Sequence, residues 1–328
     1  MRYRLLGRTG LRVSELFLGA MTYNEASPEV RGIFDLYAES GGNVVDTASM
    51  YGESENVVGE LLQGRRDRFV LATKYTPTRD RTDLNAAGNH RKNLVLSLEQ
   101  SLRRLRTDYI DLFWVHVWDR HTPIEETMRA LDDVVRSGKV LYVGISDAPA
   151  WVVSRANTLA EWRGWTPFAG LQVPYSLLWR DIERELLPMA RAQEISVAAW
   201  GVLARGVLSG RYAVPGASAS RVSPESISER DRAGAAAVIE VAGELGVTPS
   251  QVALAWALRR GVLPILGTSS AEQLKDNLGA SGVELPDEAV RRLEAAVPFE
   301  LGFPGDFVGE ADRSPDLYGD ALPRLSGR

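Results

Sequence analysis

The chain has 328 residues, 45% of them hydrophobic and 25% charged, and a formal net charge of −5. This composition is typical of globular proteins, and no basic stretch is dense enough to indicate nucleic-acid binding. Cysteine is absent, which excludes disulfides, thiolate catalysis and cysteine-ligated metals. No run approaches the ~20 apolar residues of a membrane span, and no signal-peptide pattern is present. We therefore expect a soluble, cytoplasmic protein without membrane or nucleic-acid partners.

Strand-like and helix-like segments alternate along the chain after a predicted N-terminal β-hairpin, Tyr3–Leu6 with Leu11–Val13. The predicted strands are short apolar runs near 16–20, 43–47, 69–74, 110–116, 140–145, 169–173, 195–200 and 262–266. The predicted helices are Pro28–Ser40, Ser54–Leu62, Leu94–Leu105, Ile124–Ser137, Ala150–Glu161, Ile182–Gln193, Glu229–Leu245 and Pro249–Arg260. Eight strands separated by helices favour a parallel sheet that closes into a (β/α)8 TIM barrel, an α/β fold.

Three segments interrupt this alternation: the polar loop Thr76–Asn93, the stretch Tyr212–Ser228, and the tail from Pro298. Loops this long in a compact domain are usually functional or disordered. We expect such extra loops or helices at the C-terminal face of the barrel. No linker, repeat or shift in composition divides the chain, so a single domain over residues 1–328 is predicted.

Polar residues close three successive predicted strands. Asp46 ends the second strand, with Tyr51 shortly after it, Lys74 ends the third, and His116 ends the fourth. A charged side chain at the end of a buried strand is costly unless it is paired or used. Because the loops that follow the strands share one face of a closed barrel, these four residues are expected to form one site.

The four residue types make a proton-transfer set. A tyrosine has an unperturbed pKa near ~10 and is a poor acid at neutral pH. A nearby ammonium, Lys74, held by the Asp46 carboxylate, is expected to lower the pKa of Tyr51. A neutral His116 can orient a carbonyl oxygen while Tyr51 gives it a proton. Since no residue here supplies electrons, reduction requires a cofactor that delivers hydride.

The segment Asn43–Gly52, followed by Thr73-Lys74 and Val115-His116, resembles the aldo-keto reductase family. Further segments that resemble the family are Leu5–Ser14, Leu102–Leu112, Gly144–Asp147, Gln172–Leu178 and Gly267–Asn277. The loop Asn85–Lys92 resembles one in bacterial members of the family, and the stretch Thr268–Ser270 is similar to that of potassium-channel β-subunits. The resemblance implies that Tyr51 is the proton donor, that Lys74 and Asp46 tune it, and that His116 orients the substrate.

The resemblance also implies a nicotinamide cofactor extended across the barrel mouth, bound without a glycine-rich fingerprint. The residues that match cofactor-binding positions are Gly19, Ala20, Met21, Asp46, Ser146, Gln172, Trp200, Gly201, Leu203, Arg205, Gly206, Arg211, Arg221, Gly267, Ser269, Gln273, Asp276 and Asn277. Among them Ser146 and Gln172 match positions that hold the carboxamide, and Trp200 matches the ring that stacks on the nicotinamide. The segment Leu203–Arg211 matches the loop over the pyrophosphate.

Two positions depart from the family pattern. Asp147 stands where Asn is common, beside the carboxamide site. Thr268-Ser-Ser270 stands where many NADPH-selective relatives carry Lys or Arg for the 2′-phosphate. Hydroxyl and backbone N–H groups can still bind a phosphate. The predicted cofactor is therefore NADPH/NADP+, with NADH possible.

The substrate pocket is expected to include Met21, Tyr23, Trp118 and Trp179 beside Tyr51, with contributions from the tail. Aromatic walls with few charges suit a small-molecule carbonyl substrate, including sugar-like or xenobiotic aldehydes. The predicted function is NAD(P)H-dependent reduction of aldehydes or ketones.

An alternative function is that of a cofactor-binding regulatory subunit of the channel β-subunit type with little turnover. A metal-dependent isomerase is not supported, because the histidines, His90, His116 and His121, lack an accompanying carboxylate cluster. No heptad pattern indicates an oligomeric state.

Overall fold

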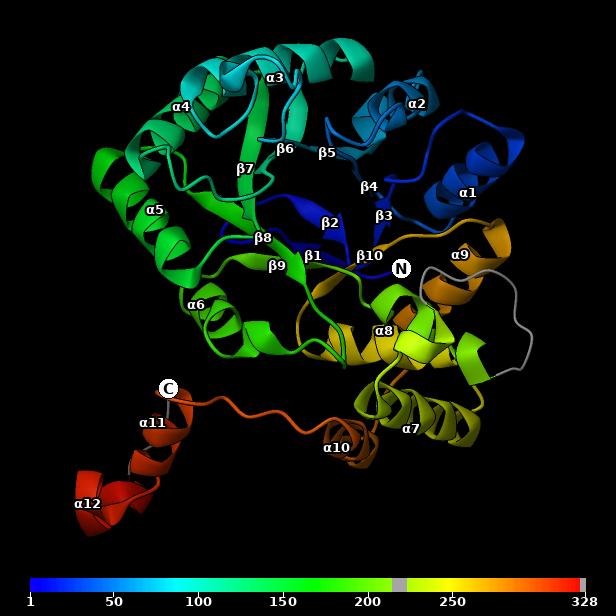
Figure 1. Cartoon of the computed structure of the whole chain (residues 1–328), viewed down its shortest axis with the longest axis vertical. Coiled ribbons are helices and arrows are strands. Elements are labelled where there is room, and N and C mark those ends of the chain that lie inside the picture. Colours follow the sequence, from blue (N-terminus) through cyan, green and yellow to red (C-terminus); the bar gives the residue numbers. More distant parts are fainter. Residues whose placement is uncertain (214–222, 325–328) are drawn as a thin grey trace.

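The computed structural model describes residues 1–213 and 223–324. Within these residues eight parallel strands close a barrel in the order β10-β3-β4-β5-β6-β7-β8-β9, which confirms the predicted (β/α)8 fold (Figure 1). The barrel strands are β3 (Phe17–Gly19), β4 (Val44–Asp46), β5 (Val70–Tyr75), β6 (Ile110–Val115), β7 (Val140–Ser146), β8 (Phe168–Pro174), β9 (Ser196–Trp200) and β10 (Leu263–Leu266). An antiparallel hairpin, β1 (Tyr3–Leu5) and β2 (Arg12–Ser14), precedes the barrel as predicted.

Helices surround the barrel, apart from two in the C-terminal tail (Figure 1). They are α1 (Pro28–Glu39), α2 (Ser54–Leu61), α3 (Arg91–Leu105), α4 (Ile124–Arg136), α5 (Ala150–Arg163), α6 (Leu186–Ala192), α7 (Glu229–Leu245), α8 (Pro249–Arg259), α9 (Ala271–Leu278), α10 (Asp287–Ala296), α11 (Gly305–Ala311) and α12 (Pro315–Tyr318). Local signals set several starts. Ser27 caps α1 ahead of Pro28, and Thr248 forms a capping box with Gln251 at α8.

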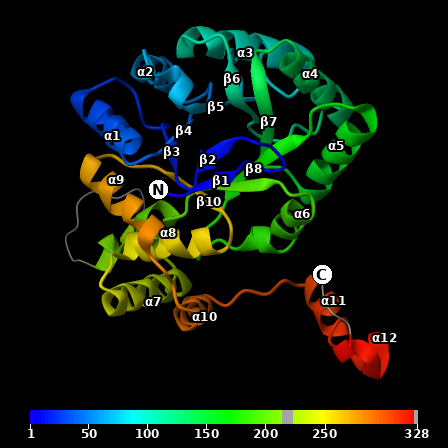
Figure 2. The same cartoon turned by 180° about the vertical axis from the view of Figure 1, so that it is seen from behind.

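Some boundaries differ from the predicted ones. Helix α3 begins three residues earlier than expected because the His90 side chain caps it, accepting a hydrogen bond from Asn93 N. The predicted helix Ile182–Gln193 is divided, since Glu185 leaves the helical region with φ −133°. No ranges were predicted for helices α9 to α12. The last two lie in the tail and stand away from the barrel in both views (Figures 1 and 2).

The hairpin closes one end of the barrel and lies in front of it in Figure 2. Leu6 and Val13 pack there with the inward-facing side chains of the strands, including Phe17 and Leu112. Trp114 fills the centre of the barrel. It fits because two facing strand residues are glycines: a Cβ at Gly144 would lie 2.3 Å from the indole ring.

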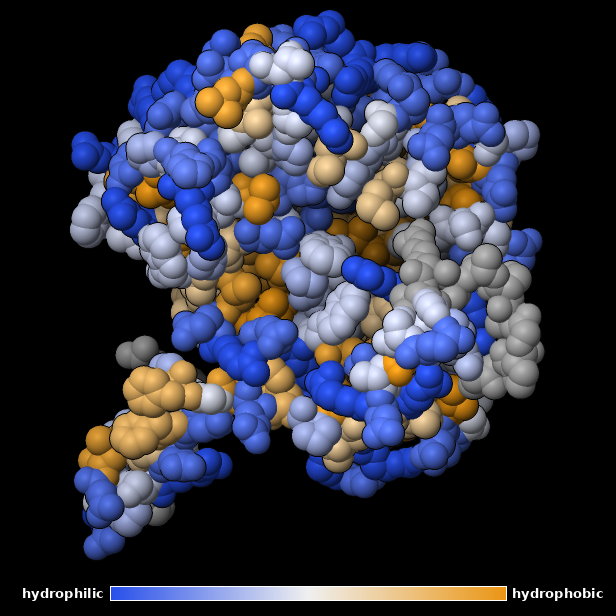
Figure 3. All heavy atoms as spheres, in the orientation of Figure 1, coloured by the Kyte–Doolittle hydropathy of each residue, from blue (hydrophilic) through white to orange (hydrophobic). Residues whose placement is uncertain are grey.

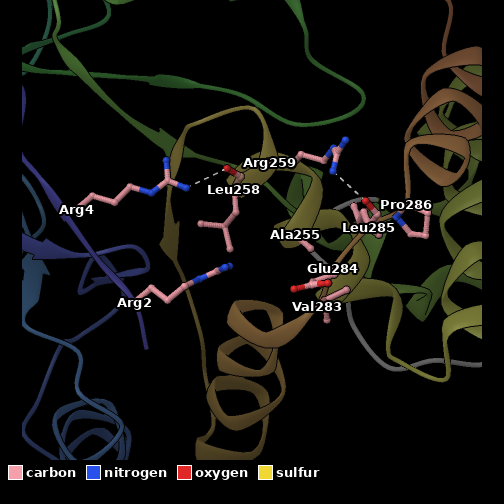
Figure 4. Close-up of a pocket in the computed structure, with 9 residues that line it drawn as sticks. All are labelled: Arg2, Arg4, Ala255, Leu258, Arg259, Val283, Glu284, Leu285 and Pro286. Carbon is pink, nitrogen blue, oxygen red and sulfur yellow. Dashed lines mark hydrogen bonds between the residues drawn. The ribbon is translucent and has the colours of Figure 1, made fainter.

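A cavity of about 500 Å³ opens beside β1, between the hairpin and helix α8 (Figure 4). Its guanidinium groups are used in structural contacts. Arg4 donates to the carbonyl oxygen of Leu258 at 3.3 Å, and Arg259 donates to that of Leu285 at 3.0 Å. These bonds tie the hairpin and the segment before α10 to the C-terminal end of α8.

In the described part of the chain, no helix is long and apolar enough to cross a membrane.

Candidate active site

The four residues predicted to form one site do come together. Asp46 and Lys74 lie on the adjacent strands β4 and β5, His116 follows β6, and Tyr51 lies in the turn after β4. The Lys74 ammonium is 5.1 Å from the centroid of the Tyr51 ring. The Tyr51 and His116 rings meet edge to face, with centroids 5.7 Å apart. Three neighbouring strands therefore place all four side chains at the barrel mouth, opposite the hairpin.

A buried ion pair forms the base of this site. Lys74 is 1% exposed, pairs with the carboxylate of Asp46, and donates to the carbonyl oxygen of Thr47 at 2.8 Å. The second carboxylate oxygen of Asp46 accepts a hydrogen bond from Gln172 Nε2 at 3.0 Å. Because both carboxylate oxygens are occupied, the ammonium is held in one place. The sequence predicted a cofactor contact for Gln172, and it did not indicate this bond to Asp46.

The pKa of Tyr51 differs from the sequence expectation. Burial raises this pKa above its ordinary value and outweighs the Lys74 ammonium, which lowers it as expected. The Asp46 carboxylate also raises it. The expected net lowering is therefore wrong for the protein without cofactor or substrate, since desolvation of the phenolate is the larger effect. As a result, Tyr51 keeps its proton at neutral pH.

His116 is neutral at physiological pH. Burial, with a further contribution from the Lys74 ammonium, lowers its pKa to about 3. Its Nδ1 atom is buried and has no hydrogen-bond partner among the described residues. A buried polar atom without a partner is costly, and such atoms are typical of functional sites.

The residues expected to hold a nicotinamide surround the same mouth. Ser146 ends β7, Gln172 lies near the end of β8, and Trp200 ends β9 with 38% of its surface exposed. Asp147, directly after Ser146, has a positive φ of 46°, and burial raises the pKa of its carboxyl while the nearby Trp200 indole lowers it. A flat heterocycle with an amide group would find here an aromatic face and polar side chains, so the residues present fit a nicotinamide.

The other predicted cofactor positions lie at the ends of β3, β9 and β10 or in the segments that follow them. Gly19 ends β3 and is followed by Ala20 and Met21; after β9 come Gly201, Leu203, Arg205, Gly206 and Arg211, and after β10 come Gly267, Ser269, Gln273, Asp276 and Asn277. Gln273 accepts hydrogen bonds from the backbone and hydroxyl of Ser269. Thr268 Oγ1 is buried there without a partner among the described residues, which again suits a ligand. Arg221 lies outside the described residues.

The four residues predicted to line the substrate pocket differ in their exposure and in their neighbours. Met21 is exposed at the mouth, and Trp118 packs edge to face against Trp151, with centroids 5.4 Å apart. Trp179 borders a second cavity of about 510 Å³, to which Phe299 of the tail also contributes. Tyr23 is 1% exposed and belongs to the hydrophobic core, so it lies behind the pocket rather than in its surface.

One aromatic residue of the mouth was missed from the sequence. Trp151 is 60% exposed at the start of α5. The signal that could have found it is its position at the start of the helix that follows a strand end, in Asp147-Ala-Pro-Ala-Trp151. Figure 3 shows the face seen in Figure 1, where apolar residues gather in a central hollow.

In the described part of the chain, no group of three or more His, Asp or Glu side chains could hold a metal ion.

Comparison with known proteins agrees with this geometry. The model of the Aldo/keto reductase family matches residues 15–298. Norsolorinic acid reductase stcV of Emericella nidulans is 40% identical over 322 residues, which cover 92% of this chain and 83% of that protein. The putative aryl-alcohol dehydrogenase AAD14 of Saccharomyces cerevisiae is 37% identical over 339 residues, covering 94% of this chain and 90% of its own length.

The family match spans most of the chain, and it confirms the resemblance read from the motifs. Members of this family typically use NAD(P)H, which supports a nicotinamide cofactor. The chain therefore belongs to the aldo/keto reductase family and is an oxidoreductase.

Proposed function

We propose that this protein reduces aldehyde or ketone carbonyls to alcohols with NADPH, with Tyr51 as the proton donor. The observation that carries the proposal is the convergence of a protonated Tyr51, the Lys74–Asp46 pair and a neutral His116 at one mouth. Bound NADPH would supply hydride for the carbonyl carbon. Ser146, Gln172 and Trp200 would hold its nicotinamide.

The protein side chains divide the remaining work. His116 orients the carbonyl oxygen by hydrogen bonding, which a neutral imidazole can do without adding charge. Tyr51 donates its proton to this oxygen as negative charge develops there. The phenolate left behind is stabilised by the adjacent Lys74 ammonium, which opposes the burial that raises the pKa of Tyr51. Asp46 and Gln172 keep the ammonium in place.

The cofactor preference rests on the start of α9. The Ser270 hydroxyl caps this helix, and Thr268 and Ser269 add hydroxyl groups in front of it. Backbone N–H groups at a helix N-terminus and nearby hydroxyls favour a phosphate, such as the 2′-phosphate of NADPH. Since no lysine or arginine occupies positions 268–270, we expect NADH to be accepted as well, with lower affinity.

The substrate class is aromatic. The mouth carries Trp118, Trp151 and Trp200, and Trp179 lies beside the second cavity. Flat aromatic rings pack well against such walls. The name of one relative, aryl-alcohol dehydrogenase, points to substrates of the same kind. We propose that aryl aldehydes and aryl ketones are preferred over sugars.

The test measures oxidation of NADPH and NADH by absorbance with a panel of aryl aldehydes, aliphatic aldehydes, ketones and sugars. We expect turnover of aryl carbonyls with NADPH, and oxidation of aryl alcohols with NADP+ in the reverse direction. The matched control is Tyr51→Phe, which should bind NADPH and show no turnover. If the wild-type protein binds NADPH without turnover over the whole panel, carbonyl reduction is refuted in favour of a regulatory subunit.

A further inference from the structure

The backbone is strained directly after the catalytic strand β5. Thr76 has φ 119°, a region that side chains rarely adopt and that is especially unfavourable for a β-branched residue. Strain of this kind persists only where surrounding contacts hold it, and it concentrates at functional sites. Thr76 is 5% exposed and lies two residues after Lys74. The structure around Thr76 therefore holds it in this conformation.

The Thr76 hydroxyl connects two segments. It accepts a hydrogen bond from the backbone N–H of His116 at 3.2 Å and donates one to Asn89 Oδ1 at 2.7 Å. The same N–H also donates to the carbonyl oxygen of Tyr75 at 3.0 Å. The strained residue thus extends the contact between β5 and β6 beyond the end of the strands, at the point where His116 is attached.

Asn89 completes this contact from the loop between β5 and α3. It is 2% exposed, and its Nδ2 donates to the carbonyl oxygen of Val117 at 3.1 Å. Its backbone N–H donates to Asp119 Oδ2 at 3.1 Å. The Thr76–Asn89 pair consequently holds the backbone on both sides of His116, through the N–H of His116 and the carbonyl of Val117.

We propose that Thr76 and Asn89 are positioning residues for His116. Through the Thr76 hydroxyl they fix the His116 imidazole relative to Lys74 and Tyr51, and so set the direction in which the substrate carbonyl is held. This rests on the proposed function of His116. It also assigns a role to the loop Thr76–Asn93, whose length marked it as functional or disordered.

The closing experiment compares Thr76→Val with Thr76→Ser. Valine keeps the β-branched shape and lacks the hydroxyl, whereas serine keeps the hydroxyl. We expect kcat for an aryl aldehyde to fall on the order of 10–100-fold in T76V, because small misplacements of a catalytic group have effects of this size. T76S should stay near the wild type, and both variants should bind NADPH with the wild-type Kd.

Imidazole NMR gives a second readout that needs no substrate. The chain has three histidines, so the His116 signals can be assigned by comparison with His116→Gln. T76V should shift the His116 signals and leave those of His121 in place, while T76S should shift neither. If T76V does not fold, Asn89→Ala takes its place in both measurements.

Two results would overturn the proposal: unshifted His116 signals in T76V, or equal losses of kcat in T76V and T76S. The NMR outcome stands even if the wild-type protein reduces no carbonyl, so failure of the proposed function and failure of the positioning role are distinguishable.

Discussion

Replacement of His116 by Gln should remove a pH dependence from the stability of this protein. Burial lowers the pKa of His116 to about 3 in the folded state, against an ordinary value of 6.5. Between these two values the unfolded chain binds a proton that the folded chain does not bind. Acidification therefore favours unfolding, and the stability associated with neutral His116 is full above pH ~6.5 and lost as the pH falls towards ~3.

The magnitude follows from the two pKa values. A pH of ~5 lies about 1.5 units below the pKa of this histidine in the unfolded chain, so the unfolded chain is protonated there. The imidazole of the folded chain is still neutral at this pH. At 1.36 kcal/mol per unit this amounts to about 2 kcal/mol of lost stability in the wild type. H116Q has no imidazole at this position, so its free energy of unfolding should fall by about 2 kcal/mol less over the same pH interval.

The assay is urea unfolding, followed by tryptophan fluorescence at pH ~7.5 and ~5, for the wild type, H116Q and His121→Gln. The change in the free energy of unfolding between the two pH values is compared across the three proteins. Contributions from titratable groups common to all three cancel in this comparison. His121→Gln, a change at an exposed loop position, should keep the wild-type difference. The reasoning is refuted if H116Q shows the same loss on acidification as the wild type.

Three further substitutions have defined outcomes. Tyr51→Phe should abolish carbonyl reduction while the Kd for NADPH stays within about twofold, since the lost hydroxyl acts on the substrate; full activity would exclude Tyr51 as proton donor. Lys74→Met should remove turnover and lower the free energy of unfolding by about 3–5 kcal/mol in urea melts, because it leaves a buried carboxylate unpaired; unchanged stability would contradict the ion pair. Gly144→Ala should destabilise by about 1–3 kcal/mol, since its Cβ would lie 2.3 Å from the Trp114 ring. Gly32→Ala, in open space on α1, is the matched control and should not destabilise.

Much of the fold was predictable because its signals are local. Short apolar runs between amphipathic segments indicated the barrel strands, and Ser27-Pro28 and Thr248-Pro249 marked two helix starts that the structure has. The ranges of the helices after residue 270 were not predicted. Those in the tail are short, and α11 exposes Phe307 and Val308 instead of burying an apolar face, so no periodicity towards a core indicates them.

The candidate site was predictable in its residue types and incomplete in its contacts. Polar residues at three strand ends indicated Asp46, Lys74 and His116 without any coordinates. The bond from Gln172 to Asp46 joins residues 126 positions apart, so only closure of the barrel brings them together. The burial of Tyr23 likewise depends on how α1 and the strands pack around it.

The sequence by itself determined which groups this protein has for proton transfer and in which order the strands present them. The tertiary structure decided their charge states and partners. Tyr51 keeps its proton and His116 stays neutral because burial dominates their pKa values, and burial is a property of the packed barrel. The strained Thr76 has the same origin: its hydroxyl bonds Asn89 and the backbone N–H of His116, which only the fold places beside it. Local chemistry is encoded residue by residue, whereas desolvation and the distances between strands arise only when the barrel closes.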